Sequence, residues 1–63
     1  MRLLEELVKV VEQVKTLIKN FEEDTDKNLN GNRAAGARAR KTSVELGKIL
    51  PIYRKLSVEA NKK

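Results

Sequence analysis

The first part of the chain carries a regular apolar repeat. From residue 3 to residue 21, apolar side chains recur at alternating intervals of four and three positions. This spacing predicts an amphipathic helix with one continuous apolar seam. Leu4, Val11 and Ile18 form a second row, so the apolar stripe is wide enough to contact two neighbouring helices, as in a four-helix bundle. We expect this helix over about 2–23, with a core of Leu3, Leu7, Val10, Val14, Leu17 and Phe21.

The repeat fails at Asp24, where an apolar residue is due. The segment 24–32 is rich in Asp, Asn, Thr and Gly, which favour turns and helix caps over helix interiors. Asn30-Gly31 is the strongest turn signal in it. Asn32 is suited to be the N-cap of a following helix. We therefore expect the first helix to end near Glu23 and a turn to follow.

A second seam with the same spacing predicts a helix over about 33–61. Pro51 lies inside this segment, where it removes a backbone hydrogen bond. We expect a kink near 47–51 rather than a break, because the seam continues in phase beyond it. The seam comprises Ala35, Ala39, Thr42, Leu46, Ile49, Tyr53, Leu56 and Ala60, and its expected core residues are Leu46, Ile49, Tyr53 and Leu56.

Two seams joined by a polar turn predict an all-α fold, an antiparallel two-helix hairpin over the single domain 1–63. A chain of 63 residues buries a marginal core by itself. Because it contains no Cys and no His, neither a disulfide nor the commonest metal ligands can add stability. We expect a homodimer that forms a four-helix bundle, with a tetramer as an open alternative. A monomeric hairpin is the other alternative, and the pattern does not decide which helices pair.

The charge is unevenly distributed along the chain. Residues 31–63 hold nine basic and two acidic side chains, a net charge of +7, whereas residues 1–30 carry −2. With a pI near 9.8, the chain is expected to have an anionic partner. On the predicted second helix the bases gather opposite the seam and form a basic stripe about 44 Å long. One row of the stripe contains Arg33, Arg40 and Arg54, and the next contains Lys41, Lys48, Lys55 and Lys62.

Lys and Arg neutralise phosphates without reading sequence, and such binding weakens strongly with salt. The outer face of the second helix is expected to offer Arg and Lys only, whereas base reading often uses Asn or Gln as well. The two aromatic residues, Phe21 and Tyr53, both fall on seams, so no exposed aromatic platform is expected for stacking on single strands. The pattern therefore favours non-specific binding to double-stranded DNA.

Other functions receive less support from the residues. Asp26, Asn28, Asn30 and Gly31 match the first half of a calcium loop, but Ala37 stands where the bidentate Glu belongs, so we expect a plain turn and no metal. Nothing predicts an enzyme, a cofactor or a small-molecule substrate. No apolar run is long enough to span a membrane, and a membrane-surface helix is disfavoured because no Trp, Phe or Leu is expected opposite the second seam.

The run 31–62 resembles the chlamydial linker-histone-like family of bacterial nucleoid proteins. The matching elements are Gly31-Asn32-Arg33-Ala34-Ala35, Arg38, Arg40, Ser43, Leu46, Lys48, Tyr53-Arg54-Lys55, Ser57, Ala60 and Lys62. The resemblance implies a histone-like protein that binds DNA and condenses the nucleoid, with self-association through its helical part. Since the sequence has no Cys, no membrane span and no signal-peptide pattern, a cytoplasmic location is expected. Longer members bind DNA through a Lys-, Ala- and Pro-rich tail. This sequence ends at Lys63 without one, so the helical stripe is the expected DNA contact.

We therefore predict an architectural protein that contacts the DNA backbone, and whose dimer clamps one duplex or bridges two. The expected DNA-binding residues are Arg33, Arg38, Arg40, Lys41, Lys48, Arg54, Lys55 and Lys62. The alternative is a small helical homo-oligomer that binds an acidic protein.

Overall fold

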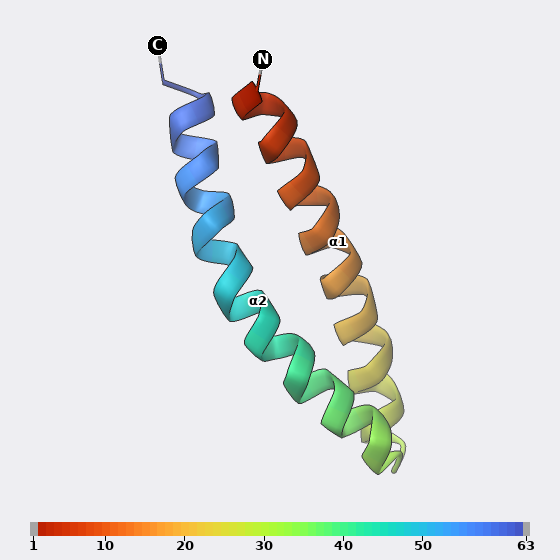
Figure 1. The fold of residues 1–63 in the computed structure, drawn as a ribbon. Helices are drawn as coiled ribbons and strands as arrows, with labels where there is room; N and C mark the ends of the chain where they lie inside the picture. Colours follow the sequence, from red (N-terminus) through yellow and green to blue (C-terminus); the bar gives the residue numbers. More distant parts are fainter. Residues whose placement is uncertain (1, 63) are drawn as a thin grey trace.

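The computed structural model describes residues 2–62, which form two helices joined by a short turn (Figure 1). Helix α1 spans Arg2–Leu29 and helix α2 spans Arg33–Ala60. The helices run antiparallel and side by side, so the start of α1 and the end of α2 lie at the same end of the molecule (Figure 1). The hairpin is a rod with extents of 49 × 14 × 13 Å. The predicted all-α antiparallel hairpin is therefore confirmed.

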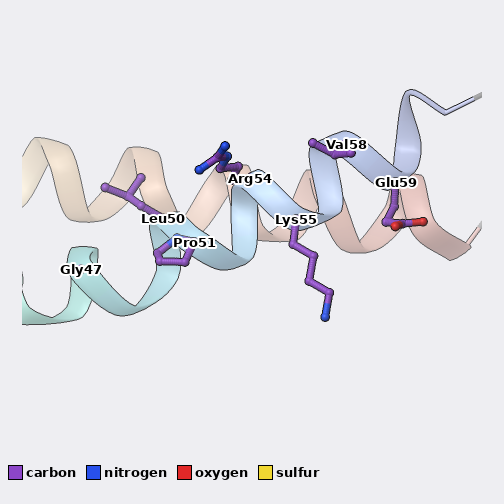
Figure 2. A pocket seen from close by; sticks show the side chains of 7 residues that line it. All are labelled: Gly47, Leu50, Pro51, Arg54, Lys55, Val58 and Glu59. Atoms are coloured by element: carbon purple, nitrogen blue, oxygen red, sulfur yellow. The ribbon is translucent and has the colours of Figure 1, made fainter.

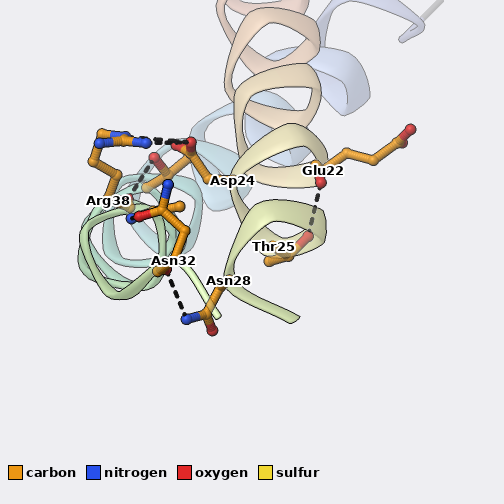
Figure 3. A network of polar contacts seen from close by, with 8 residues as sticks. Glu22, Asp24, Thr25, Asn28, Asn32 and Arg38 are labelled. Atoms are coloured by element: carbon orange, nitrogen blue, oxygen red, sulfur yellow. Dashed lines mark hydrogen bonds and ion pairs between the residues drawn. The ribbon is translucent and has the colours of Figure 1, made fainter. Parts of the chain in front are cut away.

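Helix α1 continues six residues past the end expected near Glu23. The polar residue that interrupts the seam does not end the helix, because its carboxylate has a partner across the hairpin. Asp24 Oδ1 accepts a hydrogen bond from Arg38 Nε at 3.2 Å and forms an ion pair with Arg38 Nη2 at 3.2 Å (Figure 3). The Asp24 side chain is only 13% exposed, so it fills the seam position as a paired polar residue. The turn expected over 24–32 is correspondingly shorter.

The turn begins where α1 closes with a Schellman motif. The Asn32 amide donates to the Lys27 carbonyl and the Gly31 amide donates to the Asn28 carbonyl. Gly31 has a φ of 100°, a left-handed conformation that glycine adopts without steric cost. Asn32 then caps α2, because its Oδ1 accepts from the Ala35 amide at 3.0 Å. Asn30-Gly31 and Asn32 thus have the turn and cap positions predicted for them.

The helices pack most closely next to this turn. Ala35, Gly36 and Ala39 are the buried residues of α2. A Cβ atom at Gly36 would collide with the Asn28 side-chain amide, whose nitrogen donates to the Asn32 carbonyl (Figure 3). Small side chains therefore allow the close approach of the two backbones at this end.

Away from the turn the hairpin buries its seams only partly. Most seam residues are half-buried, and within residues 2–62 no large side chain is fully buried. Tyr53, expected in the core, is 38% exposed. This exposure follows from the geometry, since two helices alone can cover only one side of each seam. A buried position for Tyr53 would require another chain.

Pro51 does not break α2. The helix is continuous from Arg33 to Ala60, and Figure 1 shows it as one gently curving ribbon. Proline removes one backbone hydrogen-bond donor, and a helix can accommodate this loss by bending locally. The hydrogen bonds on either side of the proline are retained. The face of α2 that points away from α1 is therefore a continuous surface along the rod.

Candidate nucleic-acid interface

Two rows of cations run along the exposed face of α2. Arg33, Arg40 and Arg54 recur at intervals of seven or fourteen positions, and we call them the Arg row. Residues 41, 48, 55 and 62 recur every seven positions and form the Lys row; together the two are the basic rows. All of these side chains are exposed. Lys62 lies just beyond the end of α2, where its Nζ is 3.7 Å from Glu59 Oε1.

The other members of the basic rows have no acidic partner in the described part of the chain. Ion pairs within residues 2–62 join Arg38 to Asp24 and Lys62 to Glu59. The remaining six cations of the two rows are Arg33, Arg40, Lys41, Lys48, Arg54 and Lys55. Their charges are therefore exposed and not neutralised within the hairpin.

Arg38 has a different environment from the other expected DNA-binding residues. Its guanidinium is tied to Asp24 of α1, although its side chain is still 54% exposed. The contact joins the two helices near the turn and directs the cation toward α1. The expected role of Arg38 in DNA contact remains a prediction, and the contact with Asp24 gives this residue a structural role as well.

The surface between the basic rows is not basic. A third row consists of Ala37, Val44, Pro51 and Val58, and we call it the crest row. Val44 and Val58 are 58% and 56% exposed. This observation corrects the expectation that the outer face offers Arg and Lys only. The signal was present in the sequence, because the crest residues recur every seven positions and a helix places them between the Arg and Lys rows.

The crest row is hollowed where the Arg row is interrupted. Gly47 takes the place of an arginine, and a Cβ atom there would meet nothing within 4 Å. Figure 2 shows Arg54 and Lys55 projecting to opposite sides of the helix beside this hollow. Its lining consists of Gly47, Leu50, Pro51, Arg54, Lys55, Val58 and Glu59. The floor is therefore apolar and its rims carry cations.

The two helices differ in charge as well as in position. Helix α1 contains five basic and seven acidic residues, whereas α2 contains seven basic and two acidic residues. Since the basic rows point away from α1, the positive charge is concentrated on one long side of the rod. A surface of this kind attracts a linear polyanion and holds it by many exposed cations.

Other kinds of site find no support in the described residues. The partial calcium-loop motif is not a loop, because Asp26 and Asn28 lie within α1. Between residues 2 and 62 no cluster of three potential metal-ligating side chains occurs. Neither of the two helices is long and apolar enough to cross a bilayer.

Comparison with known proteins identifies a matching family. The model of the family described as histone H1-like protein Hc1 matches residues 8–63, which include most of α1, the turn and all of α2. The search of curated proteins and the search of solved structures returned no match.

Proposed function

Because this chain belongs to the histone H1-like Hc1 family, a family of DNA-binding nucleoid proteins, we propose that it binds double-stranded DNA through the basic rows of α2, without sequence preference. The observation that carries the proposal is the segregation of charge. Six exposed cations, which have no acidic partner among residues 2–62, face away from the more acidic helix along one side of a 49 Å rod. The protein would act in the bacterial nucleoid.

Phosphate neutralisation supplies the binding free energy in this proposal. Each Lys or Arg that contacts a phosphate releases condensed counterions, so affinity falls as salt rises. If all six unpaired cations of the basic rows engage, the slope of log K against log salt would be about −5. Base reading is not expected, because α2 contains no Asn or Gln and its crest residues carry no hydrogen-bonding side chain.

The experiment is a titration of two duplexes of equal length and unrelated sequence, repeated across a series of salt concentrations. We expect equal affinities and a steep, linear loss of binding with log salt. The double variant Arg40→Gln/Lys41→Gln should flatten the slope by about 2, since each phosphate contact contributes roughly one unit. The matched control is Arg38→Gln, which should leave the slope nearly unchanged because Arg38 pairs with Asp24.

Two outcomes would contradict the proposal. One is binding that does not change with salt, and the other is a strong preference for one duplex over the other. If neither duplex binds at micromolar protein while an acidic protein does, the chain is an interaction module.

The proposal includes self-association, which is supported by the extent of exposed surface. The accessible surface of the chain is 5247 Å². A compact monomer of 7.2 kDa would expose about 4,100 Å². The hairpin thus leaves roughly 1,100 Å² more surface in water than a compact protein of its mass, an excess that a second copy could cover.

One long side of the hairpin is suited to that second copy. Leu4 and Ile18, 48% and 47% exposed, lie one position after α1 seam residues, and Leu50, 44% exposed, follows Ile49 of α2 in the same way. In an antiparallel pair these rows flank the same side of the interface. We call this the apolar side; Val8, 55% exposed, extends it. A dimer formed there would carry two sets of basic rows and could bridge or compact DNA.

A further inference from the structure

The position of the crest row bears on how α2 meets DNA. With about 100° of rotation per residue, the Arg row lies roughly 50° to one side of the crest row and the Lys row roughly 50° to the other. The residue that projects furthest from α1 is therefore apolar, and the cations diverge from it. Figure 2 shows this divergence directly for Arg54 and Lys55, on either side of Pro51.

This arrangement of rows is unfavourable for a helix that lies along a single phosphate strand. In that pose the nearest row would be the apolar crest, Val44 and Val58 would displace water from phosphates, and the cations would have to turn inward. A helix that follows one strand would instead be expected to carry its cations on the crest itself. The geometry suits a ligand with negative charge on both sides and a less charged floor.

The major groove of duplex DNA has that form. It is about 12 Å wide, admits an α-helix, and has a phosphate strand on each side. Extended Arg and Lys side chains that diverge by roughly 100° place their charged ends about 12–15 Å apart, which matches the two strands. The floor presents base edges and thymine methyl groups, which an apolar crest can contact without reading sequence.

The rest of the hairpin leaves this approach open. The crest row faces away from α1, and the rod is only 14 × 13 Å in cross-section. Helix α1, with its excess of acidic residues, would remain on the far side from the phosphates. At residue 47 no side chain projects on the Arg side, so the adjacent strand meets no obstacle there.

We infer that α2 enters the major groove with its crest row foremost, so that the Arg row contacts the phosphates of one strand and the Lys row those of the other. This inference rests on the proposed function and specifies the mode of DNA contact. It also accounts for a neutral crest in an otherwise basic face, which backbone contact alone does not.

The test compares two duplexes of identical sequence and identical phosphates. In one, every cytosine is replaced by glucosylated 5-hydroxymethylcytosine, whose sugar fills the major groove. We expect the blocked duplex to bind at least about tenfold more weakly, because a helix held outside the groove loses cationic contacts on one strand. Netropsin, which occupies the minor groove, should leave binding to the unmodified duplex unchanged.

A second measurement reads the groove directly. Dimethyl sulfate methylates guanine N7 in the major groove and adenine N3 in the minor groove. Saturating protein should reduce methylation at guanine N7 and leave adenine N3 unaffected. Equal affinity for both duplexes, or binding without protection of guanine N7, would overturn the groove inference while leaving the proposed DNA binding intact. Failure to bind either duplex would overturn both.

Discussion

Gly47 is the residue at which the Arg row is interrupted. A side chain added there would meet nothing within 4 Å, so the site tolerates substitution without rearrangement. Glycine in a helix interior costs about 0.5–1 kcal/mol relative to alanine. Because its φ lies in the ordinary helical region, the position requires no glycine for conformational reasons. Gly47 therefore weakens α2 and removes a cation from its basic face at the same time.

Filling this gap should strengthen DNA binding. We expect Gly47→Arg to raise duplex affinity at low salt and to steepen the salt dependence by about 0.9, the contribution of one added phosphate contact. Gly47→Ala is the matched control, because it makes the same backbone change without the charge. It should raise the free energy of unfolding by about 0.5–1 kcal/mol and keep the original salt slope. Equal slopes for the two variants would show that DNA does not reach this position.

Asn32 is the second residue with a definable contribution. Its side chain caps α2 through the Ala35 amide, and its backbone amide completes the end of α1. Asn32→Ala should lower the free energy of unfolding by about 1 kcal/mol, because one orphan amide of α2 loses its acceptor. Thermal unfolding followed by circular dichroism would measure the change. Asn32→Asp retains the acceptor oxygen and should remain within about 0.5 kcal/mol of the original chain.

At the scale of the helices, Asp24 explains why the end of α1 differs from the end expected from the sequence. A carboxylate in an apolar seam normally marks a helix end, because an unpaired buried charge is costly. Here Arg38, fourteen positions later, supplies the partner. Such a pair depends on the register between the helices, which neither helix encodes alone.

Replacing this polar position by an apolar one should stabilise the hairpin. Asp24→Leu continues the seam of α1 at a site that is only 13% exposed, and the half-exposed Arg38 can still be solvated. We expect the free energy of unfolding to rise by roughly 1–2 kcal/mol, since a partly buried ion pair is often replaced by apolar residues at no cost or with a gain. Urea unfolding would measure it. Asp26→Leu, at an exposed position, is the control and should change the free energy of unfolding by less than about 0.5 kcal/mol. A comparable rise for Asp26→Leu would show that the gain does not come from the seam position.

The two helices, their antiparallel order, the Asn30-Gly31 turn and the Asn32 cap could all be predicted from local signals. Seam spacing and turn chemistry act over a few residues, so they appear directly in the sequence. The true end of α1 and the pairing of Arg38 with Asp24 could not be predicted in this way, because both depend on a contact between the helices. The crest row could have been predicted from its seven-residue spacing. The charged residues on either side of it instead led to the expectation of a wholly basic face.

At the scale of the whole molecule, the hairpin has too little interior for its apolar content. Ala35 and Ala39 are its buried hydrophobic residues, whereas Leu4, Val8, Ile18 and others are about half exposed. A side of the rod measuring 49 × 14 Å offers roughly 700 Å² to a second copy, close to the 800 Å² per partner of a typical stable interface. Burial of the apolar side in a homodimer is thus of the right size to complete the core.

This proposal predicts different behaviour for charges placed on opposite sides of the hairpin. Leu4→Glu/Ile18→Glu puts carboxylates on the apolar side and should dissociate the dimer, because burying unpaired charges is costly. Ile52→Glu is the matched control, since Ile52 is also exposed, at 52%, but lines the opposite side beside Gln13 and Glu45. Sedimentation equilibrium should find a dimer for the original chain and for Ile52→Glu, and a monomer for the double variant.

The same variants separate self-association from DNA contact. The double variant keeps both basic rows, so it should still bind a duplex with a steep salt dependence but lose the ability to hold two duplexes together in a bridging assay. Its melting temperature should not depend on protein concentration, whereas that of the original chain should rise with it, because association stabilises the folded state by mass action. A monomeric original chain at tens of micromolar, or a double variant that remains dimeric, would show that the apolar side is not the interface.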